Sequence, residues 1–297
     1  MPVSKTRPKH ALVIRDYSKL EEFAAKFAEG YFNLLILIGD AGIAKSQTVR
    51  RAVGASSLWV EGSASAFGIY QALYENRGRP VVLDDVDSLY TDRDCVRLLK
   101  CLCQTDPVKT VSWYTGAVGR NKDIPRQFET TSKVIIVANE WKTLSENVRA
   151  VENRGHLLFF EPSPAEVHRK VGEWFWDQEV YDFMGENLHL LPGLSMRHYV
   201  QAAELKEAGM EWLDILHREG FSEKTILCAK IKNDPQYRTE AKRIEAFKEL
   251  GGGGRSTYFN HAKKLVGKKR VDVPHITLTG KRPEIPGARQ LRLVSGE

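Results

Sequence analysis

The fold is decided by residues 32–46, which read Phe32-Asn-Leu-Leu-Ile-Leu-Ile-Gly-Asp-Ala-Gly-Ile-Ala-Lys-Ser46. The apolar run Phe32–Ile38 is short and continuous, which is typical of a strand buried on both faces of a parallel sheet. A glycine-containing loop follows, and then a helical pattern over Lys45–Val53. This order predicts a phosphate-binding loop, because the loop amides and the positive end of the helix dipole favour anions.

The predicted nucleotide-binding set runs from the end of the strand into the first turn of the helix: Gly39, Asp40, Ala41, Gly42, Ile43, Ala44, Lys45, Ser46 and Gln47. We expect Lys45 to reach the β- and γ-phosphates of ATP and the Ser46 hydroxyl to ligate Mg²⁺. Ala44 stands where a glycine is usual in such loops. A methyl group is tolerated there if the residue keeps a negative φ, so we expect a negative φ at Ala44.

A second buried strand ends in two carboxylates. Residues 81–85 read Val-Val-Leu-Asp-Asp, and parallel-sheet enzymes place their chemistry at the carboxyl ends of strands. We expect Asp84 to hold the Mg²⁺ shell and Asp85 to orient or polarise the attacking water. In the alternative interpretation the acidic residues cap the next helix, and that role fits Asp87 better than Asp84.

Strand and helix patterns alternate through the first half of the chain. Further strands are predicted at Leu58–Val60, Val134–Ala138 and Leu157–Phe160, with helical patterns around Phe67–Tyr74, Val96–Leu102 and Leu144–Val151. This alternation predicts a three-layer α/β fold with a parallel sheet. Past Pro162 the pattern is mostly helical and suits a lid with an extension: Pro164–Asp177, Val180–Glu186, Met196–Ala208, Trp212–Arg218 and Ser222–Lys232.

Together these motifs resemble the AAA+ ATPase family over about Tyr17 to Gly209. The resemblance implies that Asn139, at the end of an apolar strand, is similar to sensor 1, which helps place the lytic water. It also implies an arginine finger, Arg154, that acts on the neighbouring subunit's ATP. Arg149 is the competing candidate, and the alternative is an ordinary surface arginine. Arg197, at the start of a lid helix, looks like sensor 2. Many relatives carry Glu where this chain has Asp85, which leaves the hydrolysis rate open.

The C-terminal part carries the positive charge of the chain. Residues 223–297 contain 17 Lys and Arg against 8 Asp and Glu, whereas the whole chain has a net charge of +6. Residues 242–250 and 255–265 read as helix, glycine turn and helix, and resemble a DNA-binding helix-turn-helix. The alternative is a helical hairpin that packs on the lid. From about Val273 the chain is expected to be extended or loosely ordered.

These patterns predict an ATPase core with an N-terminal helix over residues 1–162, a helical lid over 163–232 and a basic helix-turn-helix-like segment over 233–297. No apolar run is long enough for a membrane span, so we expect a soluble, cytoplasmic protein. The leading hypothesis is a homo-oligomeric ring or filament that binds ATP between subunits and acts on DNA, resembling ATPases of replication initiation, helicase loading or transposition. The alternatives are a remodeller of a protein client and a binding module without ATP turnover.

Overall fold

The computed structural model describes residues 8, 10–86, 92–114, 124–140, 146–191, 193–210, 212, 222–265 and 273–282. The chain forms two compact units, Met1–Ser163 and Pro164–Glu297, each of which is described by itself. Asp87, the alternative helix cap, lies outside the described residues, and so does the predicted helix after Trp212. Within the described part, no helix is long and apolar enough to cross a membrane.

The first unit is built on a six-stranded parallel sheet with the order β1-β8-β2-β7-β4-β3. The strands are β1 (Leu12–Ile14), β2 (Leu34–Gly39), β3 (Leu58–Glu61), β4 (Val81–Asp84), β7 (Val134–Ala138) and β8 (His156–Phe160). Strand β2 is buried along its whole length and pairs with β7 on one side and β8 on the other. The strand that precedes the glycine loop is therefore central, as its unbroken apolar sequence predicts.

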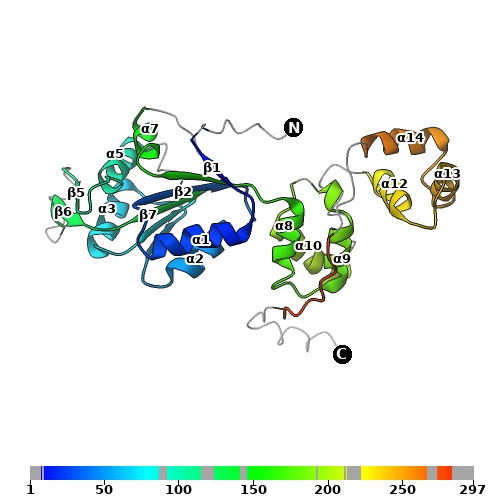
Figure 1. Cartoon of the computed structure of the whole chain (residues 1–297), viewed down its shortest axis with the longest axis horizontal. Helices are drawn as coiled ribbons and strands as arrows, with labels where there is room; N and C mark the ends of the chain where they lie inside the picture. Colours follow the sequence, from blue (N-terminus) through cyan, green and yellow to red (C-terminus); the bar gives the residue numbers. More distant parts are fainter. Residues whose placement is uncertain are drawn as a thin grey trace, which may run out of the picture. The chain divides into compact units, whose positions relative to one another are not determined.

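Helices cover both faces of this sheet, which gives the three layers visible in Figure 1. One layer contains α1 (Tyr17–Ala28) packed on α2 (Lys45–Val53). The other layer contains α3 (Ala66–Glu75), α5 (Arg93–Leu102) and α7 (Glu146–Glu152). Alternate side chains of the central strands, such as Leu34, Ile36 and Ile38, join the core with α3, α5 and α7. The predicted fold class, a parallel α/β fold followed by helical elements, is confirmed.

A β-hairpin lies between α5 and β7, where the sequence analysis placed no strand. It consists of β5 (Lys109–Ser112) and β6 (Gln127–Thr130), paired antiparallel with Val111 opposite Phe128. Both side chains are buried, and the Phe128 ring contacts the Tyr70 ring of α3 at 5.2 Å between centroids. Each of these strands has four residues with alternating burial, which is too short for the pattern to stand out in sequence.

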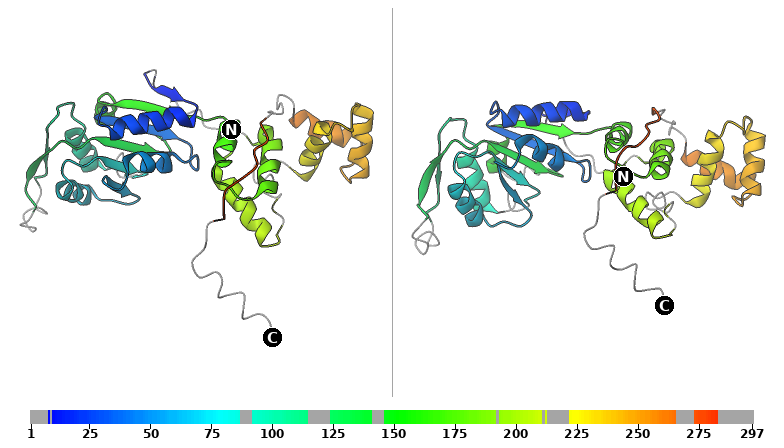
Figure 2. Two further views of the ribbon diagram at one scale, coloured as in Figure 1. Left: turned by 60° about the horizontal axis from the view of Figure 1, so that its bottom comes forward. Right: turned by 90° about the horizontal axis from the view of Figure 1, so that it is seen from below.

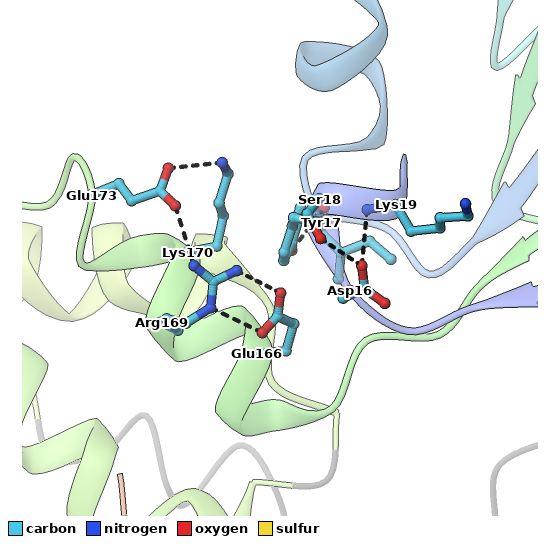
Figure 3. A network of polar contacts seen from close by, with 9 residues as sticks. Asp16, Tyr17, Ser18, Lys19, Glu166, Arg169, Lys170 and Glu173 are labelled. Atoms are coloured by element: carbon cyan, nitrogen blue, oxygen red, sulfur yellow. Dashed lines mark hydrogen bonds and ion pairs between the residues drawn. The ribbon is translucent and has the colours of Figure 1, made fainter. Parts of the chain in front are cut away.

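The second unit begins with the lid helices α8 (Pro164–Val171), α9 (Gln178–Glu186) and α10 (Met196–Glu207). Helix α8 ends earlier than the predicted Asp177, because the segment after it turns to bury Phe175. Figure 3 shows ion pairs on α8, where Arg169 and Lys170 contact acidic residues three or four positions away. The Arg169–Glu173 pair is exposed on both sides, and a pair of this kind contributes up to about 1 kcal/mol.

Three further helices form a small bundle: α12 (Glu223–Asn233), α13 (Glu240–Glu249) and α14 (Arg255–Lys264). The sequence analysis assigned the residues of α12 to the lid and its extension. In the structure, Cys228 and Ile231 of α12 share a buried cluster with Phe247 of α13 and Tyr258 of α14. Helix α12 packs this way because its apolar residues complete a core that two short helices cannot enclose alone.

The turn between α13 and α14 explains its run of glycines. Gly251 and Gly253 have φ angles of 79° and 106°, a region that glycine enters without strain. Gly252 is buried against the Phe247 ring, and a Cβ atom there would lie 2.6 Å from that ring. The turn therefore connects the two helices with its backbone packed on Phe247, and this close approach requires glycine.

Residues 273–282 are extended, as expected, and pack along the lid helices (Figure 2). The Gln178 side chain holds this segment at two points: its Nε2 donates to the Ile276 carbonyl at 3.1 Å, and its Oε1 accepts from the Leu278 amide at 2.9 Å. Gly280 packs so tightly that a Cβ atom would lie 2.2 Å from a backbone carbonyl oxygen. The chain beyond the three-helix bundle thus returns to the lid.

Candidate nucleotide site

The glycine loop lies where the sequence places it, between the carboxyl end of β2 and the start of α2. Gly39 is the last residue of β2, opposite Phe160 of β8 in the sheet register. A Cβ atom at Gly39 would lie 2.7 Å from the Phe160 carbonyl oxygen, so no other residue fits without moving β8. The close packing of the two strands therefore requires glycine at the point where the loop leaves the sheet.

Ala44 has the opposite φ sign from the one the sequence analysis expected. Its φ is 59° and its ψ is 24°, which is the left-handed region, so the expectation of a negative φ is wrong. The reason is that the loop must reverse direction before α2 begins, and Gly42 and Ala44 both use positive φ to do so. An L-residue with a Cβ atom adopts this conformation at a cost of about 1–2 kcal/mol.

Lys45 is buried, with 6% of its surface exposed. Its Nζ donates to the carbonyl oxygens of Gly39 at 2.9 Å and Asp40 at 2.7 Å, and to Asn139 Oδ1 at 3.1 Å. Lys45 is therefore a buried side chain that also supports the fold of the loop. The ammonium group holds the loop closed and lies among the loop residues proposed to bind phosphate.

Ser46 and Asp84 meet although they come from different parts of the chain. The Ser46 hydroxyl donates to Asp84 Oδ1 at 2.9 Å. Burial raises the pKa of Asp84; the neighbouring Asp85 and Glu61 charges add to the rise, while the Ser46 hydrogen bond and Lys45 oppose it. A hydroxyl and a carboxylate this close provide two of the oxygen ligands that Mg²⁺ accepts, and the donor set therefore fits that metal.

Asp85 and Asn139 form the next contact of the site. Asn139 Nδ2 donates to Asp85 Oδ2 at 2.9 Å, while its Oδ1 accepts from Lys45. Asp85 has a φ of 49°, and its amide donates to the Val137 carbonyl at 2.9 Å, which turns the chain sharply after β4. The Asn139 amide thus lies between the lysine of the loop and the second carboxylate, as the resemblance to sensor 1 implies.

The first turn of α2 differs from the first turns of α1, α3 and α5. Helices α1, α3 and α5 are capped by the side chains of Asp16, Ser65 and Asp92, whose oxygens accept backbone amides (Figure 3 shows the Asp16 cap). The residue at the same position of α2 is Ala44, which provides no side-chain cap. The start of α2 therefore offers amide donors and the positive dipole end to an anion.

Comparisons with known proteins gave matches among solved structures only. No family model and no curated protein matches the sequence. The chain is similar to the crystal structure of NtrX from Brucella abortus in complex with ATP, with 13% identity, a TM-score of 0.42 and coverage of 89% of this chain and 69% of that one. It is also similar to a DNA replication initiation factor, with 16% identity, a TM-score of 0.40 and coverage of 91% and 89%. For PCH-2 of C. elegans the identity is 13%, the TM-score 0.34 and the coverage 79% and 68%.

At these TM-scores the similarities carry no argument, so the fold assignment rests on the sheet order and on the contacts of Lys45, Asp84 and Asn139. The fold is a parallel α/β fold in which a glycine loop leaves the central strand β2. The two carboxylates stand at the carboxyl end of β4, and Asn139 follows the strand β7 that lies between β2 and β4.

The two candidate arginine fingers lie far from the loop of their own chain. Arg154 precedes β8, which runs parallel to β2, so it lies at the amino-terminal edge of the sheet, whereas the loop leaves the opposite edge. Five strand residues separate these edges by about 17 Å. The Arg154 guanidinium is half-buried and donates to the Lys100 carbonyl at the end of α5, while Arg149 is exposed in the last turn of α7. Arg154 thus contacts the end of α5 and not the loop.

Arg197 is the second residue of α10 in the lid, and its side chain is exposed. The capping box that starts α10, with Ser195 and His198, fixes the residues on either side of it. Exposure leaves the guanidinium available to a phosphate, and the role of Arg197 at the nucleotide stays a prediction.

Sequence reasoning missed one residue at the loop. Tyr17, the first residue of α1, donates its hydroxyl proton to the Ile43 carbonyl at 3.0 Å. The two residues are 26 positions apart, and a tyrosine at a helix start gives no signal of its own in one sequence. A buried tyrosine hydroxyl in an otherwise apolar helix face was the available hint, since such a group normally finds an acceptor.

Proposed function

We propose that this chain is an oligomeric AAA+ ATPase that hydrolyses ATP to ADP and phosphate and assembles on, or remodels, DNA complexes. The observation that carries the ATPase proposal is the bonded set at the loop. Asn139 links Lys45 to Asp85, and Ser46 is bonded to Asp84. These residues come from separate parts of the sequence, and their hydrogen bonds bring the loop lysine, the two carboxylates and the amide of Asn139 into one site.

Binding of the triphosphate follows from the loop and the helix start. The uncapped first turn of α2 supplies amide donors, and Lys45 would exchange the carbonyls of Gly39 and Asp40 for phosphate oxygens. Mg²⁺, when held by Ser46 and Asp84, neutralises charge on the phosphates. The pKa of Asp84 is raised because burial disfavours its negative charge. A bound Mg²⁺ would neutralise that charge, as a proton does without the metal, so the burial of Asp84 favours metal binding.

Hydrolysis needs a group that orients water near the terminal phosphate. Asp85 is the candidate, because its carboxylate is held by Asn139 and lies next to Asp84 in the chain. The Asn139 amide can donate to a water or to the carboxylate but cannot take a proton, so the proton-accepting role falls to Asp85. Aspartate is shorter than glutamate by one methylene, so its carboxylate lies farther from the water that it must orient.

The oligomer proposal rests on the position of the arginines. Arg154 and Arg149 lie at the sheet edge opposite the loop, so a finger from this region completes a site only in a second copy of the chain. A guanidinium at the phosphates stabilises the charge that develops in the transition state.

The DNA proposal is supported by the surface of α14. Its buried side is formed by Tyr258, Ala262 and Leu265, and its exposed side by Arg255, Ser256, Asn260, Lys263 and Lys264. The half-buried Phe259 lies at the border of the two sides. Clustered cations on one helix face neutralise phosphates, and the helix-turn-helix geometry presents such a face to a groove.

An ATPase assay with and without duplex DNA tests the proposal directly. DNA affinity should fall with salt, and Lys263→Ala with Lys264→Ala should flatten the slope of log affinity against log salt by up to about 2. The same change at two exposed lysines of α12, Lys224 and Lys230, is the matched control and should flatten the slope less.

Each failure has a distinct meaning. Turnover without DNA affinity would contradict the DNA role and favour a protein client. DNA affinity without turnover would identify a binding module whose loop does not hydrolyse ATP. A truncation at residue 232 is a poor substitute for the point variants, since it would expose the buried side of α12.

A further inference from the structure

We propose that Tyr17 is a positioning residue for the phosphate-binding loop: its hydroxyl holds the peptide between Ile43 and Ala44 in the left-handed turn that the loop requires. This inference rests on the proposed function, because it concerns the loop at which ATP is proposed to bind. It assigns a role to α1, the helix that precedes the loop strand, which the nucleotide motifs do not include.

The geometry around Tyr17 is fixed on all sides. The residue is 1% exposed, and Asp16 caps the helix start immediately before it by accepting the Lys19 amide. Its ring contacts the Phe160 ring edge-to-face, with 5.0 Å between centroids and an interplanar angle of 77°. Its hydroxyl reaches the Ile43 carbonyl at 3.0 Å in a buried environment. The hydroxyl therefore comes from a rigid side chain.

The same two aromatic residues hold the loop at both ends. The Phe160 carbonyl lies against Gly39, where the loop leaves β2, and a Cβ atom there would be 2.7 Å away. Tyr17 holds Ile43, just before the loop enters α2. Because Tyr17 and Phe160 pack on each other, the exit of the loop from the sheet and its entry into the helix share one support.

Holding the Ile43 carbonyl also fixes an amide. In a trans peptide the C=O and the following N–H point in opposite directions, so the Ala44 N–H points away from Tyr17. Amides of this loop are the groups proposed to receive phosphate oxygens. A peptide that rotated by half a turn would instead present a carbonyl oxygen to the phosphates and repel them.

Ala44 makes this support necessary. With a φ of 59°, it occupies a region that glycine enters freely and alanine does not. The Tyr17 hydrogen bond opposes rotation back to negative φ, and so compensates for the missing glycine. The need for Tyr17 should therefore disappear when residue 44 is changed to glycine.

The test is a double-mutant cycle with Tyr17→Phe and Ala44→Gly, read as the affinity of a fluorescent non-hydrolysable ATP analogue. Phenylalanine keeps the ring and its contact with Phe160 and removes the hydroxyl. Tyr17→Phe should weaken binding about three- to tenfold, the effect of one net hydrogen bond. In the Ala44→Gly background the same change should weaken binding less than about twofold.

The matched control is Tyr70→Phe. Tyr70 is also fully buried in this unit, and its hydroxyl donates to the Pro125 carbonyl at 2.8 Å, away from the loop. The Tyr70→Phe variant should lose about as much free energy of unfolding as Tyr17→Phe and keep the wild-type affinity for the ATP analogue. Equal losses for Tyr17→Phe and Tyr70→Phe, or an undiminished loss in the Ala44→Gly background, would overturn the proposal.

A second readout does not require nucleotide. Hydrogen exchange of residues 39–47 should be faster in Tyr17→Phe than in Tyr70→Phe, with unchanged exchange in β2 relative to that control. If the wild-type chain bound no ATP analogue, the proposed function would fail, while the exchange result would still decide whether Tyr17 holds the loop. Equal exchange in the two variants would refute the positioning role.

Discussion

Replacement of Ala44 by glycine should stabilise the first unit, although glycine in place of alanine usually destabilises a protein. Ala44 has a φ of 59°, and an L-residue with a Cβ atom adopts this conformation at a cost of about 1–2 kcal/mol. Glycine avoids that cost and adds about 0.4–1 kcal/mol of conformational entropy to the unfolded chain, which opposes the gain. The expected net gain is about 1 kcal/mol in the free energy of unfolding.

Hydrogen exchange of the β2 amides measures this change within the first unit. Residues 34–39 are buried, so their amides exchange through unfolding of the unit that contains them. A gain of about 1 kcal/mol slows this exchange about fivefold. Far-UV circular dichroism of the two proteins at 20 °C should be identical, since no element changes.

Ala25→Gly is the matched control. Ala25 is exposed in the interior of α1, in the same unit, and differs from Ala44 chiefly in having helical φ and ψ. Glycine there should cost about 1 kcal/mol and speed the β2 exchange about fivefold. The two Ala→Gly substitutions thus have opposite predicted signs. If Ala44→Gly destabilised the unit as Ala25→Gly does, the loop strain inferred from the left-handed φ would be absent.

Three further predictions concern the chemistry of the site. Asp85→Asn should retain affinity for an ATP analogue and lose turnover by at least about a hundredfold, because only the proton-accepting group is removed; parallel losses in titration and turnover would move that role to another residue. Asp84→Asn should abolish Mg²⁺-dependent ATP affinity yet raise the free energy of unfolding at neutral pH. Burial raises the pKa of Asp84 above its ordinary value of 3.8. The wild-type protein therefore gains stability as the pH falls towards 3.8 and loses that stability as the pH rises through the folded-state pKa. The urea midpoints of the two proteins should therefore converge in acid, and a constant difference across pH would contradict this account. Arg154→Ala should lower ATP turnover with ATP affinity intact, and mixing this variant with Lys45→Met should restore activity at mixed interfaces. If activity returned instead when Arg149→Ala was mixed with Lys45→Met, Arg149 would be the finger. If neither mixture regained activity although mixed oligomers had formed, a role in trans would be excluded.

The central strand, the loop and the order of the motifs along the chain can be predicted from the amino-acid sequence. An unbroken apolar run such as Leu34–Ile38 is satisfied only between two other strands, and its glycine loop and helix follow within a few residues. The same holds for Asp84 and Asp85, which stand at the end of a short buried strand. These are local patterns, and local patterns survive in one sequence because neighbouring residues in the chain must adopt compatible backbone conformations.

Contacts between residues that are distant in the chain become visible in the folded structure. Lys45 and Asn139 are 94 positions apart and Tyr17 and Ile43 are 26 apart, and both contacts exist because β7 lies beside β2 and α1 packs on α2. Packing also brings residues of α12, α13 and α14 into one buried cluster with Leu190. The sign of φ at Ala44 was decided in the same way. A loop fixed between a buried strand and a buried helix must turn where those elements place its ends, and this closure outweighs the preference of alanine for negative φ.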